Sequence, residues 1–159
     1  ERDSIPLEDE SVDFVIANQI LEHTKEIYWI NHEISRVLKK DGYIFLGVPN
    51  GLSFHNRILG LFGIHPTTSK MISAHIRNFS KRDTYFFYKT IAKSFLKVKG
   101  FYGAQFYPFP RFIARFLSRL FPSMAVSNFY IIQKTNHYNN EFIEYRKKTP
   151  VETNFYLGK

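Results

Sequence analysis

Apolar and polar positions over the first fifty residues predict a strand, a helix and a second strand. Residues 12–17 form a short apolar run, which is typical of a strand covered on both faces. A helix is expected from Thr24 or Lys25 to about Lys39, with Gly42 ending it in the left-handed conformation. Its apolar residues recur at helical spacing, at Ile27, Ile30, Ile34, Val37 and Leu38. Residues 43–48 form a second strand of the buried type, so the three elements make a βαβ unit.

A polar turn follows the first predicted strand. It spans residues 18–23 and reads Asn-Gln-Ile-Leu-Glu-His. Open α/β sheets bind their ligands outside the carboxyl ends of the strands, which is where this turn lies. We therefore expect a binding site at this turn, with the later chain extending or covering the βαβ unit.

The pattern after residue 50 predicts two more strands with helices between them. Residues 51–79 are irregular, as lids often are, and residues 54–62 form either a short helix or a mobile apolar cover. Ser80 begins a helix, because Asp83 completes a capping box, and the helix runs to about Val98 before Gly100 stops it. Strands are expected over residues 101–107 and 127–134. We assign residues 1–134 to the folded domain portion and residues 135–159 to a polar tail or short terminal element.

The stretch from Pro108 to Pro122 combines a basic and an apolar helical face. Arg111, Arg115 and Arg119 are spaced by four and share one face. A wide apolar face comes from Phe112, Ile113, Phe116, Leu117, Leu120 and Phe121. The arginines either solvate the outside of a core helix or contact phosphate on a carrier lipid or an anionic membrane surface.

Charge and composition exclude several classes of protein. The net charge of +8 is uneven, with 10 acidic and 5 basic residues up to residue 41, and 4 acidic and 17 basic residues after it. Such asymmetry is typical either of a protein with an anionic partner or of a solvated basic face.

The absence of cysteine excludes disulfides and thiol chemistry. No nucleic-acid-binding motif accompanies the charge, so nucleic acid is not an expected partner. No secretory signal or membrane-spanning run is visible, so we expect a cytoplasmic protein, with membrane association through the basic helix as one alternative.

Several short motifs in order resemble one enzyme family. They are Ile5-Pro6-Leu7 before residues 10–15, Ile20-Leu21-Glu22-His23, residues 33–42, and residues 75–80 followed by a helix ending at Gly100-Phe101. Together they resemble the second half of a class I S-adenosylmethionine-dependent methyltransferase of the small-molecule branch. The resemblance implies an α/β fold, a partial Rossmann-like sheet holding strands four to seven of the family order 3-2-1-4-5-7-6, with the last strand antiparallel and helices on its faces. The family's glycine-rich loop and its acidic residue after strand two have no counterpart, so we interpret the chain as the C-terminal portion of a longer enzyme.

The same resemblance implies roles for individual residues. Glu1, followed by Arg2, falls where the family often carries an acid near the adenine amino group. Ala17, Asn18 and Gln19 fall where the family contacts the methionine part of the S-adenosylmethionine cofactor. These five residues are therefore the candidate cofactor-binding residues.

Two histidines are candidate catalytic residues. His23 suits a base for a hydroxyl or amine acceptor near neutral pH, and its alternative role is to cap the following helix. His75 either reaches the acceptor or fixes its own loop by a hydrogen bond. His55, His65 and His75 are ten residues apart, which is not the spacing of a metal site, so no metal is predicted.

The sequence thus leads to two hypotheses about function. The first is methyl transfer from S-adenosylmethionine to a small-molecule, sugar or lipid-linked acceptor by a longer chain of which these residues are part. The second is a non-catalytic module that retains half of the fold and binds a membrane surface or a protein partner. An unpaired edge of the half-sheet would also favour a homo-oligomer.

Overall fold

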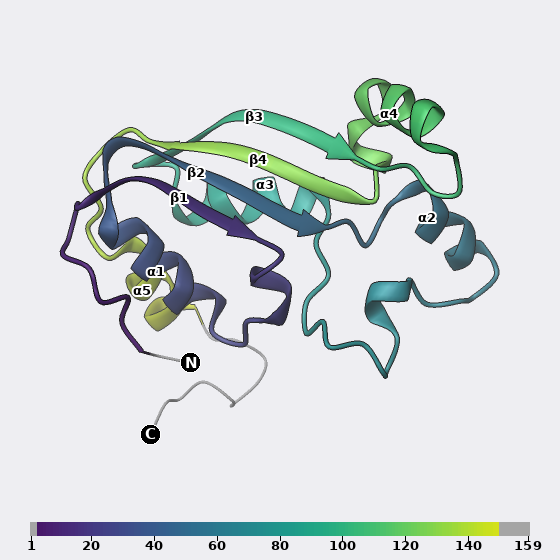
Figure 1. The fold of residues 1–159 in the computed structure, drawn as a ribbon. Helices are drawn as coiled ribbons and strands as arrows, with labels where there is room; N and C mark the ends of the chain where they lie inside the picture. The colour runs from purple at the N-terminus through teal and green to yellow at the C-terminus, as the bar shows by residue number, and fades with distance from the viewer. Residues whose placement is uncertain (1–2, 150–159) are drawn as a thin grey trace.

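The computed structural model describes residues 3–149, and its centre is one four-stranded sheet (Figure 1). The strands are β1 (Val12–Asn18), β2 (Leu38–Pro49), β3 (Leu96–Ala104) and β4 (Ser127–Lys134). Their order is β1-β2-β4-β3, in which β1 and β2 are parallel and β4 is antiparallel to both of its neighbours. This is the order 4-5-7-6 that the family resemblance implies for strands four to seven, and the α/β fold class is confirmed.

Three helices cover one face of the sheet, and two lie at its end (Figure 1). The covering helices are α1 (Ile27–Val37), α3 (Lys81–Ile91) and α5 (Glu141–Lys148). The other two, α2 (Phe54–Leu61) and α4 (Arg111–Leu120), lie beyond the carboxyl ends of β2 and β3. Short 3₁₀ turns complete the fold: η1 (Leu21–His23), η2 (Thr67–Ser69) and η3 (Pro122–Met124).

The core lies between the sheet and the three covering helices. Alternate residues of the central strands point into it, among them Leu46 and Ile132, which are 1% and 0% exposed. Phe142 of α5 is fully buried in the same cluster, so residues 141–148 form a terminal element that packs on the core. Residues 150–159, the remainder of the predicted tail, lie outside the described residues.

The opposite face of the sheet is aromatic and open. Phe14 and Ile16 are 57% and 66% exposed, and Phe14 stacks on Tyr43 of β2. The prediction that the first strand is covered on both faces is therefore wrong. Among residues 3–149, no helix packs on this face and no strand pairs with the outer edge of β1.

Two predicted helix ends are also wrong, because strand pairing extends further than local sequence suggests. The first helix ends at Val37, and residues 38–42 already belong to β2. Asp41 takes the left-handed conformation at an irregularity in the β1–β2 register, and Gly42 lies inside the strand. The helix that Ser80 caps ends at Ile91, because residues 96–98 pair with β4. Tertiary pairing overrides local propensity at both places.

A buried lysine joins the last strand to the first helix. Lys134 is fully buried, and its Nζ donates to the carbonyl oxygens of Ser35 (2.9 Å) and Leu38 (2.6 Å). It also donates to Glu10 Oε1 at 3.0 Å, which holds the pKa of the Glu10 carboxyl below its usual value. These bonds satisfy a carbonyl group at the end of α1 that has no partner within the helix.

Candidate active site at the carboxyl end of the sheet

The end of β1 is held against β2 by backbone contacts. Ala17 is 3% exposed, whereas Asn18 and Gln19 are exposed. Gln19 takes a left-handed conformation, with φ 55°, and its N–H donates to the Gly47 carbonyl at 2.8 Å. A Cβ on Gly47 would overlap with the Asn18 amide oxygen and the Phe129 ring, so only glycine lets the Asn18 side chain lie over β2.

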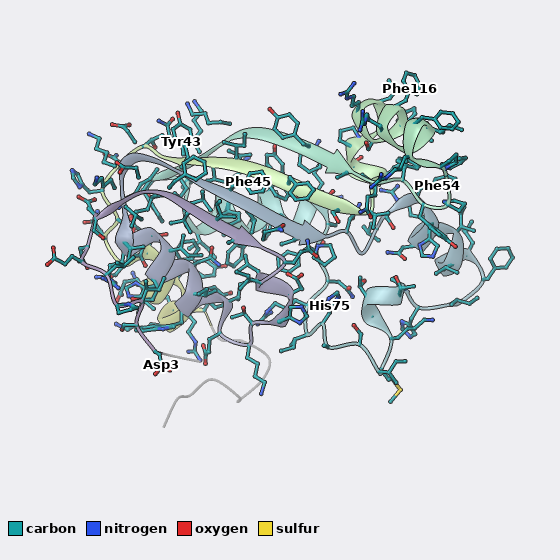
Figure 2. The ribbon with its side chains drawn as sticks, viewed as in Figure 1. Asp3, Tyr43, Phe45, Phe54, His75 and Phe116 are labelled. Atoms are coloured by element: carbon teal, nitrogen blue, oxygen red, sulfur yellow. The ribbon has the colours of Figure 1, made fainter. Side chains whose placement is uncertain are left out.

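The next turn of chain, η1, brings the two predicted catalytic histidines together. Ile76 N–H donates to the Glu22 carbonyl at 2.8 Å, which holds the loop containing residues 74–77 against η1. His23 Nδ1 lies 3.2 Å from the Ala74 carbonyl oxygen. As a result the rings of His23 and His75 meet edge to face, with centroids 4.7 Å apart, although 52 positions separate them in sequence. Figure 2 shows His75 beside the turn that follows β1.

Glu22 completes this cluster, and sequence reasoning missed it. Its side chain is fully buried between the strand end and the loop, with Oε1 3.9 Å from His23 Nε2. One ligand atom from each of Glu22, His23 and His75 lies within 4.8 Å of the others. The spacing of the three histidines in sequence did not reveal the group, because Glu22 and His23 are adjacent while His75 arrives from a distant loop. The available signal was a carboxylate next to a histidine directly after a strand.

A second feature is a cleft of about 1020 Å³ between α2, α4 and the ends of β2 and β3. Its lining includes Arg111, Arg115 and Arg119, and the described residues that line it include no Asp or Glu. Neither His23 nor His75 lines it. Asn50 supports the floor by donating from Nδ2 to the carbonyls of Ser123 (3.0 Å) and Ala125 (2.8 Å).

The helix α4 presents its largest apolar residues to solvent. Only its small residues Ala114 and Ser118 are buried against the protein. Phe112, Phe116 and Leu120 are 76%, 65% and 57% exposed, and Phe116 is labelled on this helix in Figure 2. The interpretation of a core helix with outward arginines is therefore wrong. The arginines line the cleft, and the apolar stripe beside them faces solvent.

Most of the predicted site residues can now be placed. Ala17, Asn18 and Gln19 lie at the end of β1, and His23 and His75 form a pair next to that end. Glu1 and Arg2 lie outside the described residues. The roles expected for all seven residues stay predictions.

The strand order, with an antiparallel β4 between parallel neighbours, defines the fold of a class I S-adenosylmethionine-dependent methyltransferase. Residues 2–46, which contain the end of β1 and the turn with His23, match a family model described as a methyltransferase domain. The resemblance seen in the sequence is thus confirmed. No curated protein matches the chain.

The solved structures that share the fold include the following two. One is from Thermotoga maritima and is described as a SAM-dependent methyltransferase and possible histamine N-methyltransferase. It is 16% identical, with a TM-score of 0.54, over 84% of this chain and 60% of that chain. The other is the Haloferax volcanii complex between the Trm112 methyltransferase activator and a protein described as a methyltransferase. That match is 14% identical, with a TM-score of 0.55, over 87% of this chain and 60% of that chain. The chain therefore spans 60% of the length of these two proteins.

None of the helices between residues 3 and 149 is long and apolar enough to cross a lipid bilayer.

Proposed function

We propose that this chain supplies the C-terminal part of an enzyme that transfers a methyl group from S-adenosylmethionine to a small-molecule, sugar or lipid-linked acceptor. The observation that carries the proposal is the position of residues 18–23. They follow the carboxyl end of β1, beside the parallel strand β2, where open α/β sheets bind ligands. The same residues fall inside the segment that matches the methyltransferase model.

Each candidate residue has a proposed role. Ala17, Asn18 and Gln19 would contact the methionine part of the cofactor. The left-handed backbone of Gln19 sets the direction in which the chain leaves the end of β1. The acceptor oxygen or nitrogen forms a bond to the methyl carbon as the carbon–sulfur bond breaks, and sulfur keeps the bonding electrons. His23, which is 46% exposed, would take the proton that the acceptor loses, with His75 beside it.

The arginine-lined cleft supports an anionic acceptor. None of the guanidinium groups of Arg111, Arg115 and Arg119 forms an ion pair or hydrogen bond within residues 3–149. Arginine forks match phosphate geometry, and the rings of Tyr107 and Phe109 offer apolar contact in the same cleft. A phosphate-bearing, lipid-linked acceptor fits both properties.

Calorimetry with S-adenosylhomocysteine tests the methyltransferase proposal. We expect binding to the longer protein that includes the first half of the fold, and weak or absent binding to residues 1–159 alone. Asn18→Ala in the longer protein should weaken binding, whereas Asn139→Ala, an exposed change before α5, should not. Absence of heat and of a thermal shift with the longer protein would contradict the proposal.

The second candidate function is a non-catalytic module that binds a membrane surface, and the exposed apolar stripe of α4 favours it. An interfacial helix carries such a stripe beside basic residues. Sedimentation with phosphatidylcholine vesicles containing phosphatidylglycerol tests it. Binding that is lost in Phe112→Ser/Phe116→Ser but kept in Phe86→Ser, which changes an exposed ring of α3, would support it. Equal binding by both variants would contradict it.

A protein partner or a second copy of the chain is the remaining proposal about association. The outer edge of β1 has no strand beside it among the described residues, and open edges favour pairing. The Haloferax methyltransferase was solved in a complex with an activator protein. Sedimentation equilibrium over a range of concentrations, with Ile16→Lys as the test variant, should show a monomer for the variant and self-association for the wild type.

A further inference from the structure

The carboxylate of Glu22 is the most anomalous polar group in the described residues. Its side chain is 0% exposed, and neither Oε1 nor Oε2 has a hydrogen-bond partner. Buried carboxylates in proteins are nearly always paired, hydrogen-bonded or bound to metal, because an unpaired buried charge costs several kcal/mol. The backbone of Glu22 cannot move away easily, since its carbonyl accepts from Ile76 N–H at 2.8 Å. A missing partner for this carboxylate therefore calls for an explanation.

The imidazoles of His23 and His75 lie beside this carboxylate, so an ion bound between the three side chains would contact all of them. His23 Nε2 is 3.9 Å from Glu22 Oε1, which is too long for a hydrogen bond. His75 Nδ1 is buried and also has no partner. One ligand atom from each of the three residues lies within 4.8 Å of the others. Ligand atoms of three side chains thus converge from two segments of chain.

The hydrogen bonds around the cluster suit metal binding. His23 Nδ1 lies 3.2 Å from the Ala74 carbonyl oxygen, which favours the tautomer with the proton on Nδ1. In that tautomer Nε2, on the side of the ring near Glu22, keeps its lone pair for a metal. Metal-bound histidines almost always donate their other ring N–H in this way, because the bond fixes both tautomer and ring direction. The His75 N–H donates to Ser73 Oγ at 3.2 Å and helps to hold the turn that carries the second imidazole.

We propose that Glu22, His23 and His75 bind a divalent first-row transition metal, best satisfied by Zn²⁺. One carboxylate and two imidazoles with a fourth position open is a known pattern of catalytic zinc. Tetrahedral ligands lie about 3.3 Å apart at normal zinc distances. Rotation of the exposed His23 side chain would bring the ligand atoms, now within 4.8 Å of one another, closer to this distance.

This inference does not rest on the proposed methyl transfer. If both are true, His23 would be a metal ligand instead of a base, the metal would supply Lewis-acid stabilisation of the acceptor oxygen, and the acceptor's proton would pass to solvent. Calorimetry with S-adenosylhomocysteine and titration with metal then give independent answers.

Titration of residues 1–159 with Co²⁺, followed by visible absorption, tests the site. Zn²⁺ calorimetry and thermal unfolding complete the measurement. We expect d–d absorption bands of tetrahedral Co²⁺ that Zn²⁺ removes in a 1:1 ratio, and a rise in melting temperature with Zn²⁺. His23→Ala and His75→Ala should each weaken Zn²⁺ binding by more than about 100-fold, beyond the loss typical of changes outside the ligands. His55→Ala and His65→Ala are matched controls and should bind as the wild type does.

Glu22→Gln provides the remaining test, because it keeps the shape and removes the charge. It should lose Zn²⁺ binding, with the folded state of the metal-free variant checked by circular dichroism. If that buried change unfolds the chain, the exposed residue His23 still decides the question. Absence of Co²⁺ bands in the wild type, or binding that survives both His23→Ala and His75→Ala, would overturn the proposal.

Discussion

Asn50 joins three segments at the floor of the arginine-lined cleft, so changing its side chain should have a large effect. Its Nδ2 donates to the carbonyls of Ser123 and Ala125, and its Oδ1 accepts from Leu52 N–H at 3.0 Å. Asn50→Asp keeps the volume and the Oδ1 bond. It replaces the donor that faces two carbonyl oxygens with a negatively charged acceptor.

The expected loss in unfolding free energy follows from these contacts. Two hydrogen bonds of about 1 kcal/mol each disappear, and the buried carbonyl of Ala125 is left without its donor, which costs a further 1–3 kcal/mol or so. Asn50 is only 1% exposed, so the new charge is poorly hydrated. We expect Asn50→Ala to lose about 3–5 kcal/mol, and Asn50→Asp, which loses the same donor and adds a buried charge facing two carbonyl oxygens, to lose more.

Urea unfolding at neutral pH, followed by far-ultraviolet circular dichroism, measures both variants. Asn139→Asp is the matched control, since Asn139 is exposed and its side chain supports no other segment of the described chain. That control should change the free energy of unfolding by less than about 0.5 kcal/mol. If Asn50→Asp loses less than about 1 kcal/mol, or no more than Asn50→Ala, the hydrogen-bonding argument for the cleft floor is wrong.

Three further predictions concern the strand ends and the ion pairs. Gly47→Ala should cost about 1–3 kcal/mol in urea unfolding, because its Cβ would overlap with Asn18 and Phe129. Gly60→Ala, in open space on α2, should instead stabilise by up to about 1 kcal/mol, and equal effects would contradict the steric reason. Lys134→Met should cost about 3–5 kcal/mol, since it leaves the carbonyls of Ser35 and Leu38 buried without a donor; a neutral result by thermal unfolding would refute this. Hydrogen bonds from Arg36 hold the pKa of the Glu33 carboxyl below its usual value. The stability that this carboxylate contributes is therefore complete when the pH is above the usual pKa of the unfolded chain. It is lost as the pH falls through the lower pKa of the folded state. Urea midpoints measured between about pH 5 and pH 3 should therefore fall more steeply for the wild type than for Glu33→Gln.

The capped start of α3 was predictable because it depends on a local signal, whereas the strand order followed from the family resemblance. Ser80 Oγ accepts from Asp83 N–H at 3.2 Å, which is one of the two bonds of a capping box, and donates to the Asp83 carboxylate. The helix ends were harder, because pairing with a distant strand decides them. Residues 38–42 read as the end of a helix, yet Leu38 pairs with Val12, and this contact outweighs the local preference.

The candidate site was only partly predictable for a similar reason. Asn18 and Gln19 follow a strand directly, so the topology alone places them at a ligand-binding edge. The contact between His23 and His75 depends on the path of a loop, and no local pattern records that path. The direction of α4 was also missed. The small residues Ala114 and Ser118 allow close approach to the protein, so the larger apolar residues point outward.

The position of β4 in the sheet has a consequence for the order of folding. The last strand in the described residues, β4, pairs with β2 on one side and β3 on the other, and β3 has no other strand beside it in the same part of the chain. A chain truncated before Ser127 would therefore keep the β1–β2 pair and leave β3 without any ladder. During synthesis the sheet can be completed only after Lys134 has left the ribosome, and the pairing of residues 43–49 with residues 127–133 closes a long loop. We therefore expect slow, all-or-none folding of the sheet.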